Sequence, residues 1–370
     1  MDILSFVLFV IGLGLLIGGA ELLVRTASRL ALVLGVSPLV VGLTVVAFGT
    51  SAPEVAVTTQ STLAGQADLA IGNVVGSNIA NVLLILGLSA LITPLVVAQQ
   101  LARLDIPLMI GASVLVVILS LDGNISRIEG IVLFAGIITY TVFAIRQSRK
   151  ESRAVQEEYA QEFSAPLPRR GYQVLLNIGG LVLGLALIVL GAQWLVDGAT
   201  ALARTFGVSE LVIGLTVIAV GTSLPELATS VVASLRGERD IAVGNVVGSN
   251  LFNLLSVLGI ASILAPRGIT VSDAVLRFDM PVMVAAAVAC LPIFAVGNVI
   301  ARWQGGLFVA YYGVYTAYLV LAATEHDALP VFSRALWAFV LPLTGVTLAV
   351  IAWRTWRKGR RSVLSVDSSD

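Results

Sequence analysis

Residues 42–54 read GLTVVAFGTSAPE, and residues 214–226 read GLTVIAVGTSLPE. The two stretches are identical at ten of thirteen positions, at an offset of 172. A second pair, AIGNVVGSNIAN at 70–81 and AVGNVVGSNLFN at 242–253, is identical at nine of twelve positions with the same offset. Because motifs that recur at a fixed spacing indicate an internal duplication, we predict a chain of two related halves.

The composition indicates that both halves lie in a membrane. Hydrophobic residues make up 58% of the 370 residues and charged residues only 12%, whereas a soluble domain carries about 25% charged residues. Apolar stretches recur along the chain at about 20 residues, the length that a helix needs to cross roughly 30 Å of hydrocarbon. The first stretch has only Asp2 before it and no basic residue, unlike a signal peptide. We therefore expect a retained transmembrane helix there.

Five helices are predicted in each half. The first half gives helices at 3–24, 38–63, 69–93, 104–121 and 126–146. The second half gives helices at 173–197, 208–235, 241–265, 277–297 and 303–323. Because five is odd, the second half must cross the membrane in the opposite sense, which is the inverted-repeat plan of many secondary transporters. An eleventh apolar stretch at about 330–353 has no counterpart in the first half.

The positions of the basic residues predict the orientation. With eleven helices and the N-terminus outside, the cytoplasmic segments hold 17 of the 22 Lys and Arg residues, as the positive-inside rule requires. The predicted fold is an all-α integral membrane protein with a ten-helix core of two inverted repeats, an extra C-terminal helix and the orientation N-out/C-in. Its parts are a first repeat at 1–146, a cytoplasmic linker at 147–172, a second repeat at 173–323, an additional helix at 324–353 and a basic cytoplasmic tail at 354–370.

Residues suited to enzymatic catalysis or to soft metals are scarce. The single cysteine, Cys290, lies in an apolar stretch, and the single histidine, His326, lies in a short polar connection. An internal disulfide is therefore impossible, and a zinc or copper site built from thiolates and imidazoles is disfavoured. The charged linker is interpreted as a solvated loop. We predict that the protein is not an enzyme and has no cofactor.

Each GTSxPE segment places a glutamate in the middle of an apolar helix. Pro53 removes a backbone donor, and Gly49 loosens the same segment. Carbonyls near Ala47 are then expected to lose their helical partners. An ionisable residue at membrane depth costs at least a few kcal/mol and is a functional candidate by default. Glu54 and Glu226 are therefore predicted to be central to a polar site.

A polar stripe on the following helix supports each glutamate. Asn73, Ser77 and Asn81 share one helical face, and the second half repeats the stripe at Asn245, Ser249 and Asn253. All candidate ligands are oxygen atoms, which suit Ca²⁺ with its about 6–8 oxygen ligands in flexible geometry, and also Na⁺. Mg²⁺ fits less well because it gives up its water reluctantly.

The paired GTSxPE and GNVVGSNxxN segments resemble the signature repeats of the calcium/cation antiporter superfamily, and most of all its sodium/calcium exchanger branch in a prokaryotic form without a regulatory domain. The resemblance implies ion ligation by six residues of each half: Ala47, Thr50, Ser51, Glu54, Ser77 and Asn81, then Ala219, Thr222, Ser223, Glu226, Ser249 and Asn253. It also implies that the first and sixth helices slide over the other helices and expose the site to each side in turn.

One departure from the family pattern bears on the cargo. Some relatives carry Asp at one of the positions held here by Asn81 and Asn253. With Asn at both, the predicted site has two negative charges, which argues against the potassium co-transport that the family associates with that Asp. The proton-coupled branch commonly has Asn where Thr50 and Thr222 stand, so sodium coupling is favoured here.

The expected function is antiport of Na⁺ against Ca²⁺ by alternating access in the cytoplasmic (inner) membrane, with these ions and the lipid bilayer as partners and no nucleic acid. Proton/calcium exchange through the same glutamates and a passive cation channel are the alternatives. The Arg103/Asp105 and Arg277/Asp279 pairs are interpreted as interfacial anchors. Arg25 and Asp197, which occupy equivalent positions with opposite charge, have no functional explanation in the sequence.

Overall fold

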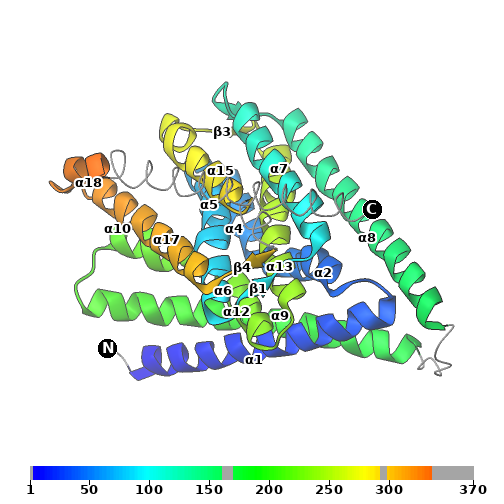
Figure 1. Cartoon of the computed structure of the whole chain (residues 1–370). Helices are drawn as coiled ribbons and strands as arrows, with labels where there is room; N and C mark the ends of the chain where they lie inside the picture. The colour runs from blue at the N-terminus through cyan, green and yellow to red at the C-terminus, as the bar shows by residue number, and fades with distance from the viewer. Residues whose placement is uncertain (1–2, 161–169, 292–297, 336–370) are drawn as a thin grey trace, which may run out of the picture.

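The computed structural model describes residues 3–160, 170–291 and 298–335, and almost all of them are helical (Figure 1). The first half contains α1 (Ile3–Leu34), α2 (Pro38–Val41), η1 (Gly42–Val46), α3 (Ala47–Thr50), α4 (Ala52–Leu63), α5 (Ala67–Ala80), η2 (Asn81–Leu86), α6 (Gly87–Ile92), β1 (Leu95–Val96), η3 (Leu101–Asp105), α7 (Ile106–Leu119), β2 (Asn124–Ile125) and α8 (Arg127–Ala160).

The second half repeats this order of elements. It contains α9 (Arg170–Thr205), α10 (Glu210–Ile213), η4 (Gly214–Ile218), α11 (Ala219–Gly221), α12 (Leu224–Leu235), α13 (Arg239–Leu251), η5 (Phe252–Val257), α14 (Leu258–Leu264), β3 (Ile269–Thr270), η6 (Val275–Asp279), α15 (Met280–Ala289), β4 (Val299–Ile300), α17 (Arg302–Ala323) and α18 (Leu329–Ala335). The elements labelled η are turns of π-helix, and those of the first half recur at matching places in the second half.

The predicted helical membrane protein is confirmed. Within the described ranges, seven helices are long and apolar enough to cross a membrane, and the pair 38–50 and 52–63, bent by 44°, makes up to an eighth. The shorter apolar helix α12 follows the matching break in the second half. The first residues of the predicted eleventh helix, 330–335, lie in α18, and the rest of it lies outside the described residues.

The predicted linker differs from the structure. The helix α8 continues to Ala160 and α9 begins at Arg170, so much of the 147–172 segment is helix where a solvated loop is expected from its charge. Charged and alanine residues such as those at 149–160 are compatible with a helix that has left the apolar layer. The first helix is also longer than predicted, ending at Leu34.

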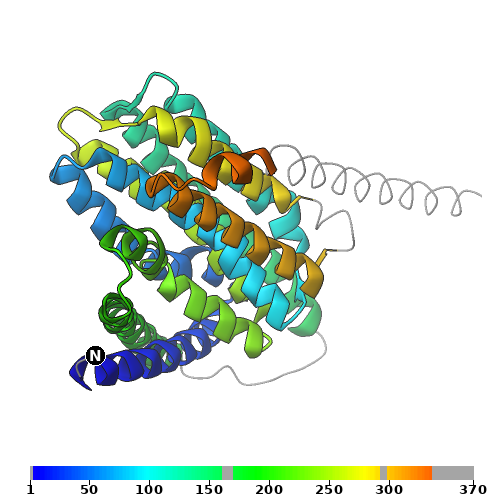
Figure 2. The same ribbon diagram turned by 90° about the vertical axis from the view of Figure 1, so that its left-hand side faces the viewer.

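Two helices, α1 and α9, lie side by side along one side of the bundle (Figures 1 and 2). Their backbones touch through glycines. A Cβ atom added at Gly191 would lie 2.7 Å from the carbonyl oxygen of Gly12, and one at Gly184 would lie 3.0 Å from that of Gly19. Small residues allow this close approach of helices in a membrane, so the two helices form one tightly packed pair.

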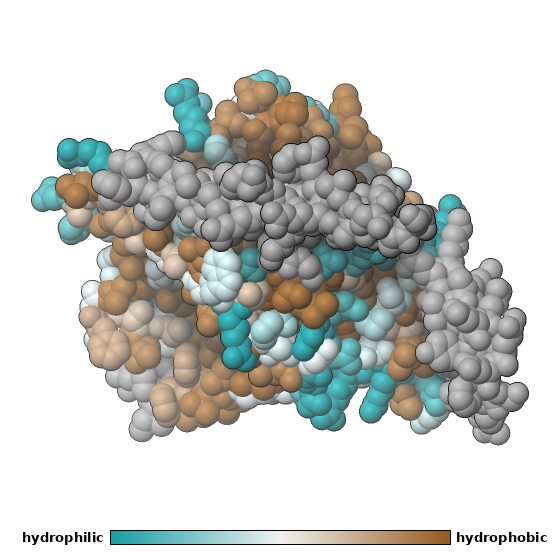
Figure 3. Space-filling view, viewed as in Figure 1, coloured by the Kyte–Doolittle hydropathy of each residue, from teal (hydrophilic) through white to brown (hydrophobic). Residues whose placement is uncertain are grey.

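The centre of the bundle is formed by α5–η2–α6 and α13–η5–α14. Every residue of α13 from Ile241 to Leu251 is buried, whereas the outer helices leave many large apolar side chains exposed. Hydrophobic residues cover much of the face shown in Figure 3, as expected for contact with lipid. The two halves are also joined by short antiparallel strand pairs, β1 with β4 and β2 with β3.

The interpretation of Asp105 as an interfacial anchor is wrong. Its side chain is fully buried, and the Tyr140 hydroxyl donates a hydrogen bond of 3.1 Å to Asp105 Oδ1. In the second half the Tyr315 hydroxyl donates to Asp279 Oδ1 at 2.9 Å. A buried polar group such as Asp105 needs a partner of this kind, and the half-buried Asp279 makes the equivalent link between two helices.

Candidate cation site

Both glutamates lie in the first turn of a half-helix that begins at a break. Ser51 separates α3 from α4, and Thr222 and Ser223 separate α11 from α12. Pro53 and Pro225 stand within the first two positions of α4 and α12, where a helix needs no backbone donor. The positive end of a helix dipole favours a carboxylate there, so the local sequence both breaks the helix and accommodates the glutamate.

The predicted loss of helical partners at Ala47 is wrong. The backbone N–H of Ser51 donates to the Ala47 carbonyl oxygen at 3.0 Å, and the Thr50 hydroxyl reaches the same oxygen at 3.3 Å. The chain changes direction after this turn, at Ser51, so the turn itself stays hydrogen-bonded.

Each glutamate reaches the break of the other half. Ser51 Oγ donates to Glu226 Oε1 at 3.1 Å. Ser223 Oγ makes the equivalent, longer contact of 3.5 Å with Glu54 Oε1, and Ser77 Oγ lies at the same distance from that oxygen. Both carboxylates are fully buried. Residues about 170 positions apart in the sequence therefore build one polar cluster.

The two threonines contact the asparagines of the opposite stripe. Thr50 Oγ1 donates to Asn245 Oδ1 at 3.1 Å and lies 3.4 Å from Ser249 Oγ. Thr222 Oγ1 donates to Asn73 Oδ1 at 3.3 Å. Asn245 and Asn73 therefore have a specific role: they orient the hydroxyl groups of Thr50 and Thr222, which are predicted ligands.

Two further hydroxyls hold those asparagines, and sequence reasoning missed both. Asn73 Nδ2 donates to Thr58 Oγ1 at 2.9 Å, and Asn245 Nδ2 donates to Ser230 Oγ at 3.0 Å. Thr58 and Ser230 are equivalent residues at the offset of 172. The sequence does contain a signal for these two residues, because both halves have a hydroxyl residue four positions after the glutamate.

The asparagines that end the stripes are buried and only partly bonded. Asn81 Nδ2 donates to Asn250 Oδ1 at 3.0 Å, and Asn250 Nδ2 contacts Met109 Sδ at 3.3 Å. Asn81 Oδ1 has no hydrogen-bond partner, and Asn253 has none for either its oxygen or its nitrogen. Asn250 also escaped the sequence prediction.

Among the described residues, four predicted ligands from both halves have a buried oxygen without a hydrogen-bond partner: Glu54 Oε2, Glu226 Oε2, Asn81 Oδ1 and Asn253 Oδ1. Leaving a buried polar or charged oxygen without a partner costs about 1–3 kcal/mol or more. A hard cation with oxygen ligands would satisfy such atoms together, so the donor set fits Na⁺ or Ca²⁺.

Ten of the twelve predicted ligand residues are buried, and two are not. Ala219 is exposed and Thr222 is half-buried, whereas their equivalents Ala47 and Thr50 are buried. The hydrogen bonds described above join most of the predicted set, while one edge of it, on the second half, is partly exposed. In the part of the chain that the structure describes, no group of three or more His, Cys, Asp or Glu side chains could hold a metal.

Sequence comparisons give the site its context. The family model described as "Sodium/calcium exchanger protein" matches residues 4–146 and 176–321. The chain is 43% identical over 266 residues to the inner membrane protein YrbG of Escherichia coli, covering 71% of this chain and 81% of that protein. It is 33% identical over 351 residues to the sodium/calcium exchanger MaX1 of Methanosarcina acetivorans, covering 87% of this chain and 99% of MaX1.

The fold has solved counterparts as well. Structures of the sodium-calcium exchanger NCX_Mj, soaked with different concentrations of Na⁺ and Ca²⁺ or Sr²⁺, match with a TM-score of up to 0.73 and 32% identity. The match covers 86% of this chain and 99% of NCX_Mj. The duplicated motifs thus lie within a fold already seen in a membrane transporter.

Proposed function

Because the chain belongs to the sodium/calcium exchanger family, we propose that it exchanges Na⁺ for Ca²⁺ across the membrane by alternating access. The family consists of integral membrane cation antiporters, so the prediction that the chain is not an enzyme is confirmed. The likeness to an inner membrane protein supports a place in the bacterial inner membrane.

One observation carries this proposal. Two buried carboxylates from different halves each have an unpaired oxygen, and each accepts a contact from the serine at the other half's break. A Ca²⁺ ion balances two negative charges, and so do two Na⁺ ions. The two ionic species would therefore compete for Glu54 and Glu226, and occupancy by one would exclude the other.

The ligand set that we propose is the twelve residues named from the family resemblance. Glu54 and Glu226 supply the charge, and Ser51, Ser223 and Ser77 orient them. Ala47 and Ala219 would contribute backbone carbonyl oxygens. The Ala47 carbonyl keeps a second lone pair for an ion after accepting its backbone hydrogen bond.

Alternating access also needs a suitable architecture. We propose a ten-helix core of two inverted five-helix repeats, oriented N-out/C-in, with 1–146 and 173–323 as the repeats. The reciprocal contacts Ser51–Glu226 and Ser223–Glu54 support this arrangement. So does the matching pair Thr50–Asn245 and Thr222–Asn73. A site placed where inverted repeats meet can be uncovered from either side.

Proton/calcium exchange is the second candidate, and the same carboxylates favour it. A proton on Glu54 Oε2 or Glu226 Oε2 would also relieve a buried charge, so H⁺ could replace Na⁺ as the counter-ion. Thr50 and Thr222 stand where the proton-coupled branch commonly has Asn, which favours Na⁺. The driving gradient separates the two candidates by experiment.

Flux into proteoliposomes tests the proposal. We expect uptake of radioactive Ca²⁺ into vesicles loaded with Na⁺, no uptake into choline-loaded vesicles, and loss of uptake in Glu54→Gln and Glu226→Gln. The exposed Glu325 provides a matched control, because Glu325→Gln removes a carboxylate far from the site in sequence. Uptake driven only by a pH jump would establish the proton-coupled candidate. Uptake without any counter-ion gradient would indicate a channel.

A further inference from the structure

Three buried side chains next to the proposed site are joined in a row by hydrogen bonds. Asn81 Nδ2 donates to Asn250 Oδ1 at 3.0 Å, and Asn250 Nδ2 donates to Met109 Sδ at 3.3 Å. The three residues come from η2, α13 and α7, and α13 packs against both of the other elements. Asn81, Asn250 and Met109 are 1%, 2% and 0% exposed. This amide row therefore has a buried sulfur at one end and, at the other, the Asn81 oxygen, which has no partner among the described residues.

The sulfur of Met109 sets the direction of the amide row. A thioether has no hydrogen to donate and can only accept, so Asn250 turns its NH₂ group toward Met109. The oxygen of Asn250 then faces Asn81, and only the NH₂ group of Asn81 can pair with it. Turning both amides over would bring the Asn250 oxygen against the sulfur, two acceptors without a proton between them. The oxygen of Asn81 is therefore the atom that the row leaves free.

We infer that Met109 and Asn250 are positioning residues, which fix the orientation of the Asn81 amide so that its oxygen faces a bound cation. An amide oxygen binds Ca²⁺ or Na⁺, whereas an NH₂ group is a donor and repels both ions. The two ends of an amide have nearly the same shape, so packing alone does not choose between the two orientations. The inference rests on the proposed function, because it takes Asn81 as an ion ligand.

The second half has the same residue types and lacks the row. Asn253, Asn78 and Met283 stand at the equivalent positions, and α5 packs against η5 and α15. However, Asn78 Nδ2 donates to the Val74 carbonyl oxygen of its own helix at 2.7 Å. Asn78 Oδ1 and both amide atoms of Asn253 have no partner within the described ranges. Met283 is 2% exposed, so it provides a buried methionine in the equivalent place that positions no proposed ligand.

Leucine variants test the inference through the affinity for Ca²⁺, measured by isothermal titration at fixed pH and ionic strength. Met109→Leu nearly keeps the side-chain volume and removes the acceptor, so the reversed orientation of the two amides becomes populated. When about half of the molecules present the NH₂ group of Asn81, the apparent Kd for Ca²⁺ rises about two- to threefold. Asn250→Leu should weaken binding at least as much. Met283→Leu is the control and should bind as the wild type does, and a Met109→Leu protein that also does so would overturn the inference.

An isosteric replacement separates orientation from packing. Norleucine has a CH₂ group in place of the sulfur of methionine, whereas selenomethionine keeps an acceptor there. The chain has four methionines, so Met280→Leu together with Met283→Leu leaves Met109 as the only one besides Met1. In this background, norleucine should raise the Kd for Ca²⁺ about two- to threefold, and selenomethionine should leave it unchanged. Equal affinities for the two labelled proteins would overturn the inference.

Thermal unfolding without Na⁺ or Ca²⁺ gives a readout that does not need ion binding. Met109→Leu leaves the buried NH₂ group of Asn250 without its acceptor, so the midpoint should fall by about 2 °C. In the Asn250→Leu background the same change should cause no further fall. An equal fall in both backgrounds would show that the sulfur does not hold Asn250 and would overturn the inference. Failure of the wild type to bind Ca²⁺ would instead refute the proposed function, and this measurement would still decide on the amide row.

Discussion

Asn253 contributes a buried amide whose oxygen and nitrogen both lack hydrogen-bond partners. Its element η5 packs against α4, the half-helix that carries Glu54, and Asn253 is one of the two positions that set the charge of the proposed site. With Asn at both 81 and 253, the proposed ligands carry two negative charges. The side chain of Asn253 is therefore the simplest place at which to change the charge without changing the shape.

Asn253→Asp is expected to strengthen Ca²⁺ binding by about tenfold. A third carboxylate in a buried site attracts a divalent ion more strongly, and a tenfold change corresponds to about 1.4 kcal/mol. Isothermal titration of the purified protein at fixed ionic strength measures the change. Asn253→Ala, which removes the oxygen without adding charge, is the control and should weaken binding. Equal affinities for the wild type and Asn253→Asp would place Asn253 outside the ion's reach.

Ser230 offers a test of the residues that hold the site. Its hydroxyl accepts the 3.0 Å hydrogen bond from Asn245 Nδ2, whose other contact, to the Glu226 carbonyl oxygen, is long at 3.4 Å. Ser230→Ala should lower the free energy of unfolding by about 1–3 kcal/mol, because it leaves a buried amide donor poorly paired. Thermal unfolding in detergent measures this loss. Ser234→Ala is the control, since Ser234 bonds only to a carbonyl of its own helix, and an equal loss there would contradict the account.

At this scale the sequence points to the two buried glutamates and misses the hydroxyls that hold the asparagines. Glu54 and Glu226 are evident because a carboxylate in an apolar helix is rare. Thr58 and Ser230 are not evident, because a hydroxyl in a membrane helix can bond to its own backbone without any functional role. Only the fold shows that Thr58 and Ser230 accept hydrogen bonds from Asn73 and Asn245. These asparagines in turn accept hydrogen bonds from the threonines of the other half.

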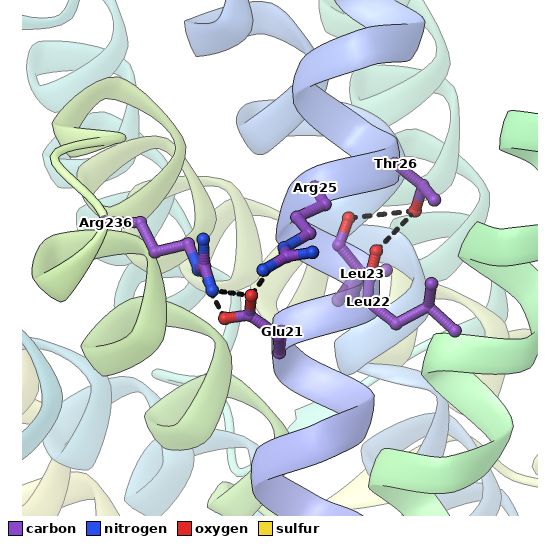
Figure 4. A network of polar contacts seen from close by, with 6 residues as sticks. All are labelled: Glu21, Leu22, Leu23, Arg25, Thr26 and Arg236. Carbon is purple, nitrogen blue, oxygen red and sulfur yellow. Dashed lines mark hydrogen bonds and ion pairs between the residues drawn. The ribbon is translucent and has the colours of Figure 1, made fainter.

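The helix α1 is tied by charge to the end of α12. Figure 4 shows Glu21 between Arg25 of its own helix and Arg236 at the end of α12. Ser28 adds a second link, donating to Glu238 Oε1 at 2.8 Å. The equivalents of Glu21 and Arg236 are Gln193 and Ala64, which cannot form an ion pair. This ion pair between helices is therefore specific to the first half's α1. Arg25 pairs with Glu21, whereas its equivalent Asp197 stands four residues after Gln193, which carries no charge.

Arg236→Gln is expected to leave the stability nearly unchanged and to change the rate of ion exchange. A partly exposed ion pair contributes about 0.2–1 kcal/mol, and Glu21 keeps Arg25 as a partner. If α1 slides past α12 during transport, the pair must break, so its removal should speed Na⁺-driven Ca²⁺ uptake by about two- to fivefold. Arg25→Gln is the matched control, because it removes a charge from Glu21 without cutting a link between helices. Equal rates for the two variants would show that α1 does not slide past Arg236.

The existence and order of the apolar helices are predictable from apolar length, and their ends are less so. The helix α8 runs on to Ala160 because charged residues can continue a helix once it has left the apolar layer. The break at GTSAPE is predictable from Pro53, yet its exact place at Ser51 is not, since Pro is tolerated in the first turn of a helix. The burial of Asp105 depends on Tyr140, which lies 35 residues away.

In the molecule as a whole, the two halves have matching sequences and different states. Gly244 and Gly248 pack against the backbone of Leu39 and Leu43, whereas an added Cβ atom at Gly72 or Gly76 meets none of the described residues within 4 Å. The buried centre is shared between the halves. Sequence comparison of the halves predicts the shared parts, because identical residues build equivalent contacts. It cannot predict which side is closed, because that difference comes from the positions of η1 and η4 and not from their residues.

The central claim is that Na⁺ and Ca²⁺ share one site built around Glu54 and Glu226. Equilibrium binding of radioactive Ca²⁺ to the purified wild type, measured against rising Na⁺ at constant pH and ionic strength, tests it most directly. We predict that Na⁺ displaces Ca²⁺ completely with a Hill coefficient above one, and that Glu54→Gln and Glu226→Gln bind no Ca²⁺ at the same concentrations. Ca²⁺ binding that persists unchanged at saturating Na⁺ would contradict the claim, because it would place the two ions at separate sites.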